Sequence, residues 1–414
     1  MAKTLPSSFL RMRIDRWSQF ELLELDMDPR VTMLIGTNGT GKTTLLRVLA
    51  TRLGSRFPFF STPYLLGNNR FMRWPNLHLS SPFFHGWDVN GVFHYNQGLI
   101  TFNDDSRAPL MIPANPNVSY EIVFDKDIKI EGLFFPAHRP IIPTKKSAIR
   151  IDYPNSKAAA KAFFERLKNL QRRHPGAFSS PQLISDTIHS LYRGNQRAGR
   201  DLLHKYKSLV SSILEPNYEF AGFSFVDEDT LVHINGRRFR ISAASGGVAS
   251  MLDLAFQILL KSFLKKKFVV LLDEPENHLH PELQRQLVPA LVEHFENVQF
   301  VIATHSPLVA SSCSPSSSRI YNFTLNDDGF SEASLSDPSL MGANADEVLH
   351  DVFGMPETVP KWAKEQFKKI IQKYLEKDVS TESIRELRKD MAVFGLSELI
   401  PDAVEEMFRK KSDD

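Results

Sequence analysis

The chain has 414 residues, of which 50 are Lys or Arg and 48 are Asp or Glu, so its formal net charge at pH 7 is +2. Hydrophobic residues make up 42% of the chain and charged residues 24%, a profile typical of a globular protein with a sizeable core. The near balance of charge does not indicate a nucleic-acid partner, although local basic patches remain compatible with one. The length suffices for two or three domains, or for one large domain with insertions.

Simple counts also disfavour membrane and secreted proteins. We find no apolar run long enough to cross a bilayer, and residues 1–6 lack the apolar core of a signal peptide. Cys313 is the only cysteine, which excludes an intrachain disulfide and a multi-cysteine zinc site. We therefore expect a cytoplasmic protein with no membrane partner.

Residues 8–26 predict two strands joined by a turn near Asp15 and Arg16, because apolar residues alternate on either side of that point. Trp17 and Phe20 are candidates for stacking on an adenine ring. Large aromatic residues in such strands are more often part of a core, and both interpretations stay open at this point.

The stretch Gly36–Thr43 reads Gly-Thr-Asn-Gly-Thr-Gly-Lys-Thr, the spacing of a phosphate-binding loop. An apolar strand, residues 31–35, precedes it and a helix-compatible segment, residues 44–50, follows it, which is the context that the motif requires. Glycines let backbone N–H groups converge on a phosphate, and the helix N-terminus adds its positive dipole end. Lys42 is expected to reach the β- and γ-phosphates of ATP, and the Thr43 hydroxyl to bind Mg²⁺. The predicted nucleotide-binding residues of this loop are Asn38, Gly39, Thr40, Gly41, Lys42, Thr43 and Thr44.

Periodicity is weak in residues 55–118, where Phe, Pro, Asn and Gly predict short strands and long loops. The best-marked turns are Val89–Gly91 and Asn96–Gly98. Alternation returns at residues 119–124 and 128–135, which predict two further strands.

The second of these strands is followed by His138 and Arg139 in the segment Pro136–Pro140. Polar residues at a strand end near a phosphate loop would contact the nucleotide or Mg²⁺, or would simply belong to a surface loop. The sequence does not decide between the two.

Residues 156–215 change to helical periodicity and predict three helices. Basic residues crowd this region, which is either a solvated helical face or a surface that contacts a nucleic-acid backbone. They are Lys161, Arg166, Lys168, Arg172, Arg173, Arg193, Arg197 and Arg200.

Residues 218–241 predict three short strands, with Asn235–Gly236 as a hairpin turn. The residues Ser245, Gly246 and Gly247 then stand at the start of an apolar helix predicted from Ala249 to Leu264. Ser-Gly-Gly at a helix N-terminus is an anion-binding arrangement, but the pattern is weak when taken alone.

Two more predicted buried strands are each followed by acidic or histidine residues that could act on a nucleotide. Residues 268–272 are apolar and lead to Asp273, expected to hold Mg²⁺, and Glu274, expected to polarise the attacking water. Residues 298–304 form the next strand and lead to His305, which at that position would touch the γ-phosphate.

Four motifs in this order, GTNGTGKTT, ASGG, VVLLDEPENHLHP and VIATHSP, resemble the ABC-type ATPases of the soluble RecF, SMC and OLD group. The resemblance covers about residues 8–325. It implies an α/β fold: a P-loop NTPase of ABC type with a mixed β-sheet core, a helical insertion lobe and a C-terminal helical tail. The implied domains are the N-terminal half of the core (1–155), the helical lobe (156–215), the C-terminal half of the core (216–335) and a C-terminal helical segment (336–414).

The resemblance also assigns roles. Lys42 and Thr43 would bind ATP and Mg²⁺, Ser245–Gly247 would be the signature motif, Asp273 the metal ligand, Glu274 the catalytic acid and His305 the switch histidine. The signature acts on ATP bound by the other protomer, so a homodimer or a higher oligomer is implied.

This sequence departs from the family pattern at three places. The signature has Ala244 where Leu is usual and Val248 where Gln is usual, and the usual glutamine loop is replaced by residues 135–139. These departures imply slow hydrolysis rather than loss of ATP binding. His278 and His280 could bind a metal, but their place after the acidic motif favours a dimer contact.

Other patterns known from this group are missing from the sequence. We find no spaced acidic set like that of a Toprim nuclease, no His-Asn-His nuclease pattern and no CxxC zinc hook. The chain then resembles the ATPase subunits of bacterial anti-phage systems such as the Septu and PARIS types, in which the ATPase controls a separate nuclease or toxin. The alternative is a RecF-like or SMC-like DNA-repair ATPase that binds DNA directly. A transporter subunit is disfavoured by the loop after Glu274 and by the large insertions.

Overall fold

The computed structural model describes residues 7–61, 63–65, 71–73, 86–89, 92–113, 119–124, 128–140, 142, 151–174, 180–214, 218–226, 229–314, 317–336, 361–375, 380–401 and 403–404. The chain forms two compact units, Met1–Val348 and Leu349–Asp414. All the nucleotide motifs predicted from the sequence lie in the first unit.

One twelve-stranded mixed sheet forms the core of the first unit, with the strand order β11-β9-β8-β1-β2-β19-β18-β3-β17-β16-β12 and β7 paired to β8. The strands β12, β16, β17, β3 and β18 run parallel to one another, whereas β1, β2, β8, β9 and β11 pair antiparallel. The bounds are β1 (Phe9–Trp17), β2 (Phe20–Asp26), β3 (Val31–Gly36), β7 (Gly86–Val89), β8 (Val92–Phe102), β9 (Arg107–Pro113), β11 (Val123–Phe124), β12 (Gly132–Phe135), β16 (Phe268–Asp273), β17 (Val298–Thr304), β18 (Ser318–Leu325) and β19 (Ser331–Leu335).

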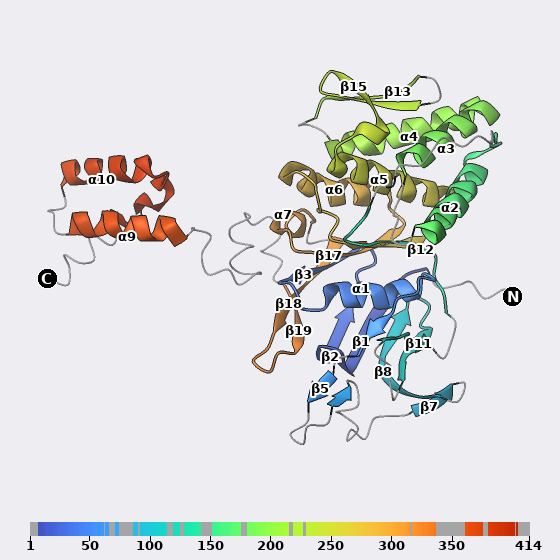
Figure 1. Cartoon of the computed structure of the whole chain (residues 1–414), viewed down its shortest axis with the longest axis horizontal. Coiled ribbons are helices and arrows are strands. Elements are labelled where there is room, and N and C mark those ends of the chain that lie inside the picture. The colour runs from blue at the N-terminus through green and yellow to red at the C-terminus, as the bar shows by residue number, and fades with distance from the viewer. Residues whose placement is uncertain are drawn as a thin grey trace. The chain divides into compact units, whose positions relative to one another are not determined.

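The parallel strands are covered on both faces, which explains their continuous apolar sequences. Every residue of β3, β16 and β17 is buried. The helix α1 (Lys42–Thr51) packs on one face, and α5 (Gly246–Leu264) and α6 (Pro281–His294) cover the other (Figure 1). Short elements complete this unit: β4 (Phe59–Phe60), β5 (Pro63–Leu65), β6 (Phe71–Arg73), β10 (Ser119–Tyr120), the 3-10 helix η2 (Ile241–Ala243) and α7 (Pro307–Ala310).

The N-terminal hairpin turns at Ser18 and Gln19, three residues later than the sequence predicts. Asp15 still pairs with Leu22, and the last pair of the hairpin is Trp17 with Phe20. Trp17 and Phe20 are buried, and the Trp17 indole donates to the Tyr120 hydroxyl at 2.8 Å. Both aromatic residues therefore belong to the core, and the adenine-stacking interpretation is wrong for them.

The predicted turn at Asn96–Gly98 is also wrong, because these residues lie inside β8. The pairing of β8 with β9 shifts register between Asn96 and Leu99, which is a β-bulge. At Gly98 a Cβ atom would lie 2.3 Å from the Arg13 carbonyl oxygen of β1, so the glycine permits a close approach of two strands. The other predicted turn falls between Val89 and Val92, which pair, but residues 90–91 lie outside the described residues.

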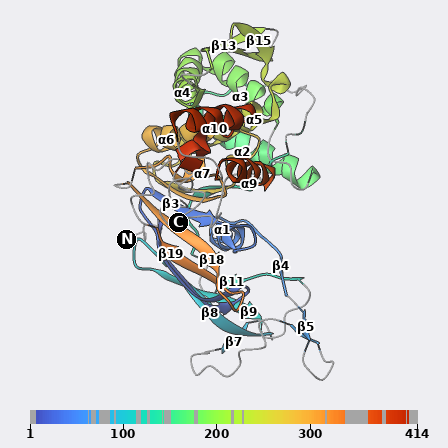
Figure 2. The same cartoon turned by 90° about the vertical axis from the view of Figure 1, so that its left-hand side faces the viewer.

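The lobe beyond α5 consists of α2 (Ser156–Arg173), α3 (Pro181–Gly194), α4 (Gln196–Leu214) and a three-stranded sheet of β13 (Phe220–Val226), β14 (Asp229–Ile234) and β15 (Arg237–Arg240). Figure 2 shows these layers from the side, with the small sheet outermost. Phe163 of α2 packs edge-on against Phe256 of α5 at 5.5 Å between ring centroids. The hairpin turn at Asn235–Gly236 has positive φ at both residues, as the sequence predicts.

The helix α5 corrects one expectation from the sequence. By length and composition alone it is apolar enough to cross a membrane, although 72% of its apolar window is buried inside the protein. It contacts α2, α3, α4 and β12. Its apolar character is explained by its place in the core.

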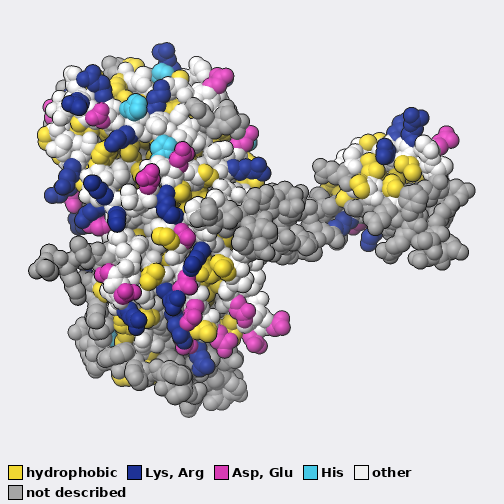
Figure 3. All heavy atoms as spheres, turned by 180° about the vertical axis from the view of Figure 1, so that it is seen from behind, with side chains coloured by type: hydrophobic (Ala, Val, Ile, Leu, Met, Phe, Trp, Pro, Cys, Tyr) yellow, Lys and Arg dark blue, Asp and Glu magenta, His cyan; other side chains and the backbone are white. Residues whose placement is uncertain are grey.

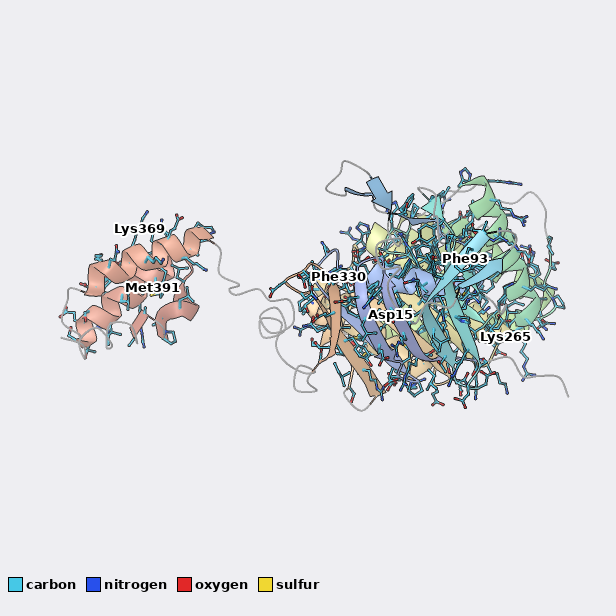
Figure 4. The ribbon with its side chains drawn as sticks, turned by 90° about the horizontal axis from the view of Figure 1, so that it is seen from below. Asp15, Phe93, Lys265, Phe330, Lys369 and Met391 are labelled. Atoms are coloured by element: carbon cyan, nitrogen blue, oxygen red, sulfur yellow. The ribbon has the colours of Figure 1, made fainter. Side chains whose placement is uncertain are left out.

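The second unit is a small helical body formed by α9 (Lys361–Leu375), α10 (Thr381–Val393) and the 3-10 helix η5 (Ser397–Leu399). Met391 is fully buried between α9 and α10, whereas Lys369 is exposed (Figure 4). The Lys373 ammonium and the Tyr374 hydroxyl both bind the Asp390 carboxylate, at 2.7 and 2.8 Å. Of the C-terminal helical segment expected at 336–414, residues 337–360 lie outside the described residues.

Candidate functional site

Four strand ends meet at one edge of the large sheet. The neighbouring strands β3, β17, β16 and β12 are parallel, so their carboxyl ends share an edge. The segments that leave this edge are the phosphate loop after Gly36, the acidic motif at Asp273 and Glu274, His305 after β17, and the loop containing Arg139. Ligands of open α/β sheets bind at such carboxyl edges.

The backbone of the phosphate loop depends on glycine. Gly36, Gly39 and Gly41 have φ values of 135°, 84° and 89°, a region that other residues rarely adopt. A Cβ atom on Gly36 would lie 2.2 Å from the Phe323 carbonyl oxygen, and one on Gly41 would lie 2.4 Å from the Phe20 ring. The loop is thus wedged between β18 and the N-terminal hairpin.

Lys42 lies beneath the loop with only 4% of its surface exposed. Its ammonium donates to the carbonyl oxygens of Gly36 and Thr37, at 2.9 and 2.7 Å, and to the Thr40 hydroxyl at 3.2 Å. Burial lowers the pKa of Lys42 to about 8, and the neighbouring Glu274 and Asp273 oppose that shift. The loop oxygens therefore hold the Lys42 ammonium in place, and an ammonium can form charge-assisted hydrogen bonds to a phosphate.

Thr43 and Asp273 come together across the site. The Thr43 hydroxyl donates to the Asp273 carboxylate at 2.9 Å. Burial raises the pKa of Asp273 to about 6, while the Thr43 hydrogen bond works against that rise. A hydroxyl and one carboxylate are an oxygen donor set that fits Mg²⁺, which usually takes few protein ligands beside phosphate oxygens and waters.

Glu274 and His305 form the second polar pair of the site. The Glu274 carboxylate lies 3.3 Å from His305 Nε2 and accepts from the Asn277 amide at 2.9 Å. Burial, and then the charge of Lys42, lower the pKa of His305, which disfavours its charged form. The geometry places a carboxylate beside this histidine.

Glu276 is a residue of the site that the sequence did not reveal. Its buried carboxylate accepts from the Thr304 hydroxyl at 2.6 Å and from the backbone N–H groups of His305 and Ser306 at 2.9 and 3.2 Å. Among the described residues, its second oxygen, Oε2, has no hydrogen-bond partner. The only signal in the sequence is a third acidic residue after Glu274, which reads as a solvated loop.

The predicted signature residues lie at the N-terminus of α5. Ser245 is the N-cap and makes no side-chain cap hydrogen bond, and both Ser245 and Gly246 are exposed. In the part of the chain that the structure describes, no hydrogen bond joins them to the phosphate loop. Gly247 is buried, and a Cβ atom there would lie 2.1 Å from the His278 carbonyl oxygen.

Arg139 fits neither interpretation from the sequence, because it is buried and binds protein atoms. Its guanidinium donates to backbone carbonyls of the acidic motif and to Ser250 of α5. His138 is exposed. His278 and His280 are exposed too, and among the described residues no group of three or more His, Cys, Asp or Glu could hold a metal.

Most basic residues of the lobe are on its surface. Arg166 and Arg193 form ion pairs with Asp186 and Asp152, at 2.6 and 2.9 Å. The other six predicted residues of this set are exposed. Figure 3 shows Lys and Arg side chains, in dark blue, gathered over the lobe on the face opposite to that of Figure 1.

Comparison with known proteins places this geometry in a family. A protein-family model described as "AAA domain, putative AbiEii toxin, Type IV TA system" matches residues 31–311. The chain is 26% identical over 219 residues to the retron Ec83 probable ATPase of Escherichia coli, covering 51% of this chain and 37% of that one. It is 22% identical over 362 residues to the retron Vc95 probable ATPase of Vibrio cholerae serotype O1 biovar El Tor, covering 71% of this chain and 69% of that one. The chain thus spans little more than a third of the first relative.

Solved structures similar to this chain include SMC head domains. The SMC head domain from Thermotoga maritima is 14% identical, with a TM-score of 0.39 over 80% of this chain and 99% of that one. An SmcHead bound to the C-winged helix domain of ScpA is 13% identical, with a TM-score of 0.43 and the same coverage.

Proposed function

This chain belongs to that AAA domain family and is a P-loop ATPase, and we propose that two copies hydrolyse ATP between them to control a separate effector protein. The observation that carries this proposal is the meeting of Lys42, the Thr43–Asp273 pair and the Glu274–His305 pair at one sheet edge. A buried cation, a metal-ligand pair and a carboxylate base are the parts that phosphoryl transfer to water needs.

The proposed chemistry follows from these side chains. The loop N–H groups and Lys42 would hold the phosphates, and Thr43 and Asp273 would hold Mg²⁺, which would neutralise phosphate charge. Glu274 accepts a proton from a water whose oxygen attacks the γ-phosphorus, and the bond to the ADP oxygen breaks. His305, held by Glu276 through its backbone N–H, faces the same space.

Dimerisation is supported by the exposure of the α5 N-terminus. Free N–H groups of a helix start attract anions, and those near Ser245 and Gly246 face solvent. We infer that they bind the γ-phosphate of ATP held by the second copy. A single chain then holds only part of each site, and turnover requires association.

Light scattering tests this association. The Glu274→Gln protein, in which the base is removed, should bind ATP–Mg²⁺ without turnover and should associate on its addition. The Glu274→Gln/Ser245→Arg protein should stay dissociated, because a bulky cation blocks the closed interface. The matched control is Glu274→Gln/Ser208→Arg, with the same substitution at an exposed serine of α4, which should associate normally. Equal association in all three proteins would refute an interface at the signature.

Control of an effector is supported by the names of the relatives, both of which are given as retron probable ATPases. The experiment is co-expression with the product of the neighbouring open reading frame, followed by assay of that product's nuclease or toxin activity. The activity should depend on ATP binding and should change when Lys42→Ala replaces the wild type. An effector that behaves identically with both proteins would contradict the proposal.

A second candidate function, direct DNA binding by a repair ATPase, is favoured by the charge of the lobe. Residues 156–240 contain 14 Lys and Arg against 8 Asp and Glu, although the whole chain is nearly neutral. Reversing Arg172, Arg173 and Arg197 to Glu should lower the salt slope of duplex binding by about 3, roughly one per phosphate contact. If the wild type shows no duplex binding at low salt, the basic set is only a solvated face.

A further inference from the structure

Arg139 has an unusual set of partners for a buried arginine. Its side chain is 9% exposed, and all three guanidinium nitrogens donate hydrogen bonds to protein oxygens. Nε donates to Ser250 Oγ (3.2 Å), Nη1 to the carbonyls of Pro136 and Asp273 (both 3.1 Å), and Nη2 to the carbonyls of Glu274 (3.1 Å) and Pro275 (3.2 Å). One side chain therefore fixes three consecutive carbonyls of the acidic motif.

Those carbonyls surround a strained residue. Glu274 has a φ of 46°, the left-handed region, which is costly for a residue with a Cβ atom. Its N–H donates to the Ala303 carbonyl at 2.8 Å, and its own carbonyl accepts from Arg139. Because strain persists only when its surroundings hold it, Arg139 is one of the groups that keep Glu274 in this conformation.

The same guanidinium reaches the helix whose N-terminus carries the signature. Ser250 and Gly247 lie three residues apart on α5 and therefore share a face. Gly247 contacts the loop at His278, and Ser250 contacts it through Arg139. The N-terminal turns of α5 are thus joined at two points to the loop that carries Glu274.

We propose that Arg139 is a positioning residue that couples the N-terminus of α5 to the carboxylate of Glu274. This inference rests on the proposed function, in which Glu274 is the base and Ser245 contacts ATP on the second copy. A shift of α5 on ATP engagement moves Ser250, and the guanidinium carries that shift to the carbonyls on both sides of Glu274. The base then takes up its working orientation only in the closed dimer.

Arginine is suited to this role by its geometry. Its planar fork presents five N–H donors in fixed directions, whereas a lysine ammonium presents three on a flexible stem. Arg139→Lys therefore retains the positive charge beside Asp273, Glu274 and Glu276 but loses the fork. Arg30 offers a matched control, because its guanidinium also binds three backbone carbonyls, at the other end of the sheet.

Steady-state kinetics on the full chain provide the first test. Arg139→Lys should lower kcat by about 30-fold while the Kd for ATP, measured by calorimetry, changes less than about 3-fold. In the Glu274→Gln background the same substitution should have no further effect on residual hydrolysis, because the residue it positions is gone. Arg30→Lys should leave kcat within about 2-fold of the wild type. If the effects of Arg139→Lys and Glu274→Gln multiply, the positioning role is overturned.

Hydrogen exchange provides a test that does not depend on turnover. In the protein without nucleotide, Arg139→Lys should speed amide exchange in residues 274–277 by about 10-fold or more, and Arg30→Lys should not. Unchanged exchange in that segment would overturn the inference. If Glu274→Gln hydrolyses ATP as fast as the wild type, the proposed function fails at its base, while the exchange result still decides whether Arg139 holds the loop.

The link to α5 is tested by Ser250→Ala, which removes only the Nε contact. In the Glu274→Gln background, addition of ATP–Mg²⁺ should protect residues 274–277 from exchange when Ser250 is present. The protection should be lost in Glu274→Gln/Ser250→Ala, although association by light scattering persists. Equal protection in both proteins would show that Arg139 does not transmit from α5.

Discussion

The two ends of the parallel strands use the same kinds of residues to opposite effect. At the amino end, Arg30 donates to carbonyls at the end of α6 and just beyond it, those of Val292 (2.6 Å), Phe295 (2.8 Å) and Glu296. Gln299 accepts from the Phe9 N–H and donates to the carbonyls of Phe9 and Asp28, each at 2.9 Å. Through these contacts the Arg30 and Gln299 side chains satisfy backbone groups at this end of the strands.

At the carboxyl end, polar groups are instead held in costly states. Glu274 and His278 have φ values of 46° and 68°, and one buried oxygen of Glu276 accepts no hydrogen bond from the part of the chain that the structure describes. Burial shifts the pKa of Lys42 downward and that of Asp273 upward. Strained backbone and shifted pKa values cluster at functional sites. The comparison therefore indicates that the amino ends of the strands are built for stability and the carboxyl ends for function.

The largest expected effect concerns the cost of burying Asp273. Its folded-state pKa of about 6 lies above the ordinary 3.8, so its contribution to stability is full below about pH 4 and is lost as the pH rises through 6. Asp273→Asn stays neutral and should be more stable than the wild type by up to about 3 kcal/mol at pH 7, and nearly equal at pH 4. Urea unfolding without nucleotide or Mg²⁺ measures this. Asp201→Asn, at an exposed aspartate of α4, gives the reference change, and equal stability of wild type and Asp273→Asn at pH 7 would break the comparison.

A somewhat smaller effect is expected for the buried cation. Lys42→Ala removes a charge-assisted contact to phosphate and should weaken ATP binding by more than ~2 kcal/mol, or about 30-fold. Calorimetric titration measures this loss. The control is Lys261→Ala, since Lys261 is a partly buried lysine of α5 paired with Glu131 at 2.8 Å, and its loss should leave ATP affinity unchanged. Unchanged affinity in Lys42→Ala would mean that the loop does not bind phosphate.

The smallest expected effect is a loss of stability on changing Arg30, at the amino ends of the parallel strands. Arg30→Lys loses part of the cap on α6 and should lower the free energy of unfolding by about 1 kcal/mol. ATP affinity should not change, because no residue of the carboxyl edge contacts this guanidinium among the described residues. Urea unfolding and ATP titration of the same Arg30→Lys protein measure the two quantities. A loss of ATP affinity alongside the loss of stability would mean that the amino and carboxyl ends of the strands are not independent.

The sequence could predict the features that depend on residues close together in the chain. The strand before Gly36 and the strand before Asp273 are local apolar patterns, so their ends, and hence the meeting of the motifs, could be expected from the order of strands and helices. The structure agrees with the expected α/β fold around a mixed sheet. Assignment of roles to these residues, and the division into domains, stay predictions.

Other features depend on contacts that a sequence does not display. Apart from the Pro136 carbonyl, the partners of Arg139 lie 111 to 136 positions away, so the neighbouring sequence does not indicate that Arg139 is buried. Glu276 sits beside Glu274, where a third acid normally indicates solvent. A glycine such as Gly98 is typical both of a turn and of a β-bulge. Only the close approach of β1, which the sequence does not display, identifies the bulge.

The wedging of the phosphate loop has a consequence for how the chain is made. The glycines fit against Phe20 on one side and Phe323 on the other, and β3 lies between β17 and β18, whose residues begin at Val298 and Ser318. On a ribosome that adds roughly 5–20 residues per second, at least about 13 seconds separate emergence of the loop from that of its neighbours. Until then the apolar strand β3 lacks both pairing partners, so the nucleotide site is among the last parts of this unit to form, and the nascent chain depends on protection of that exposed strand in the interval.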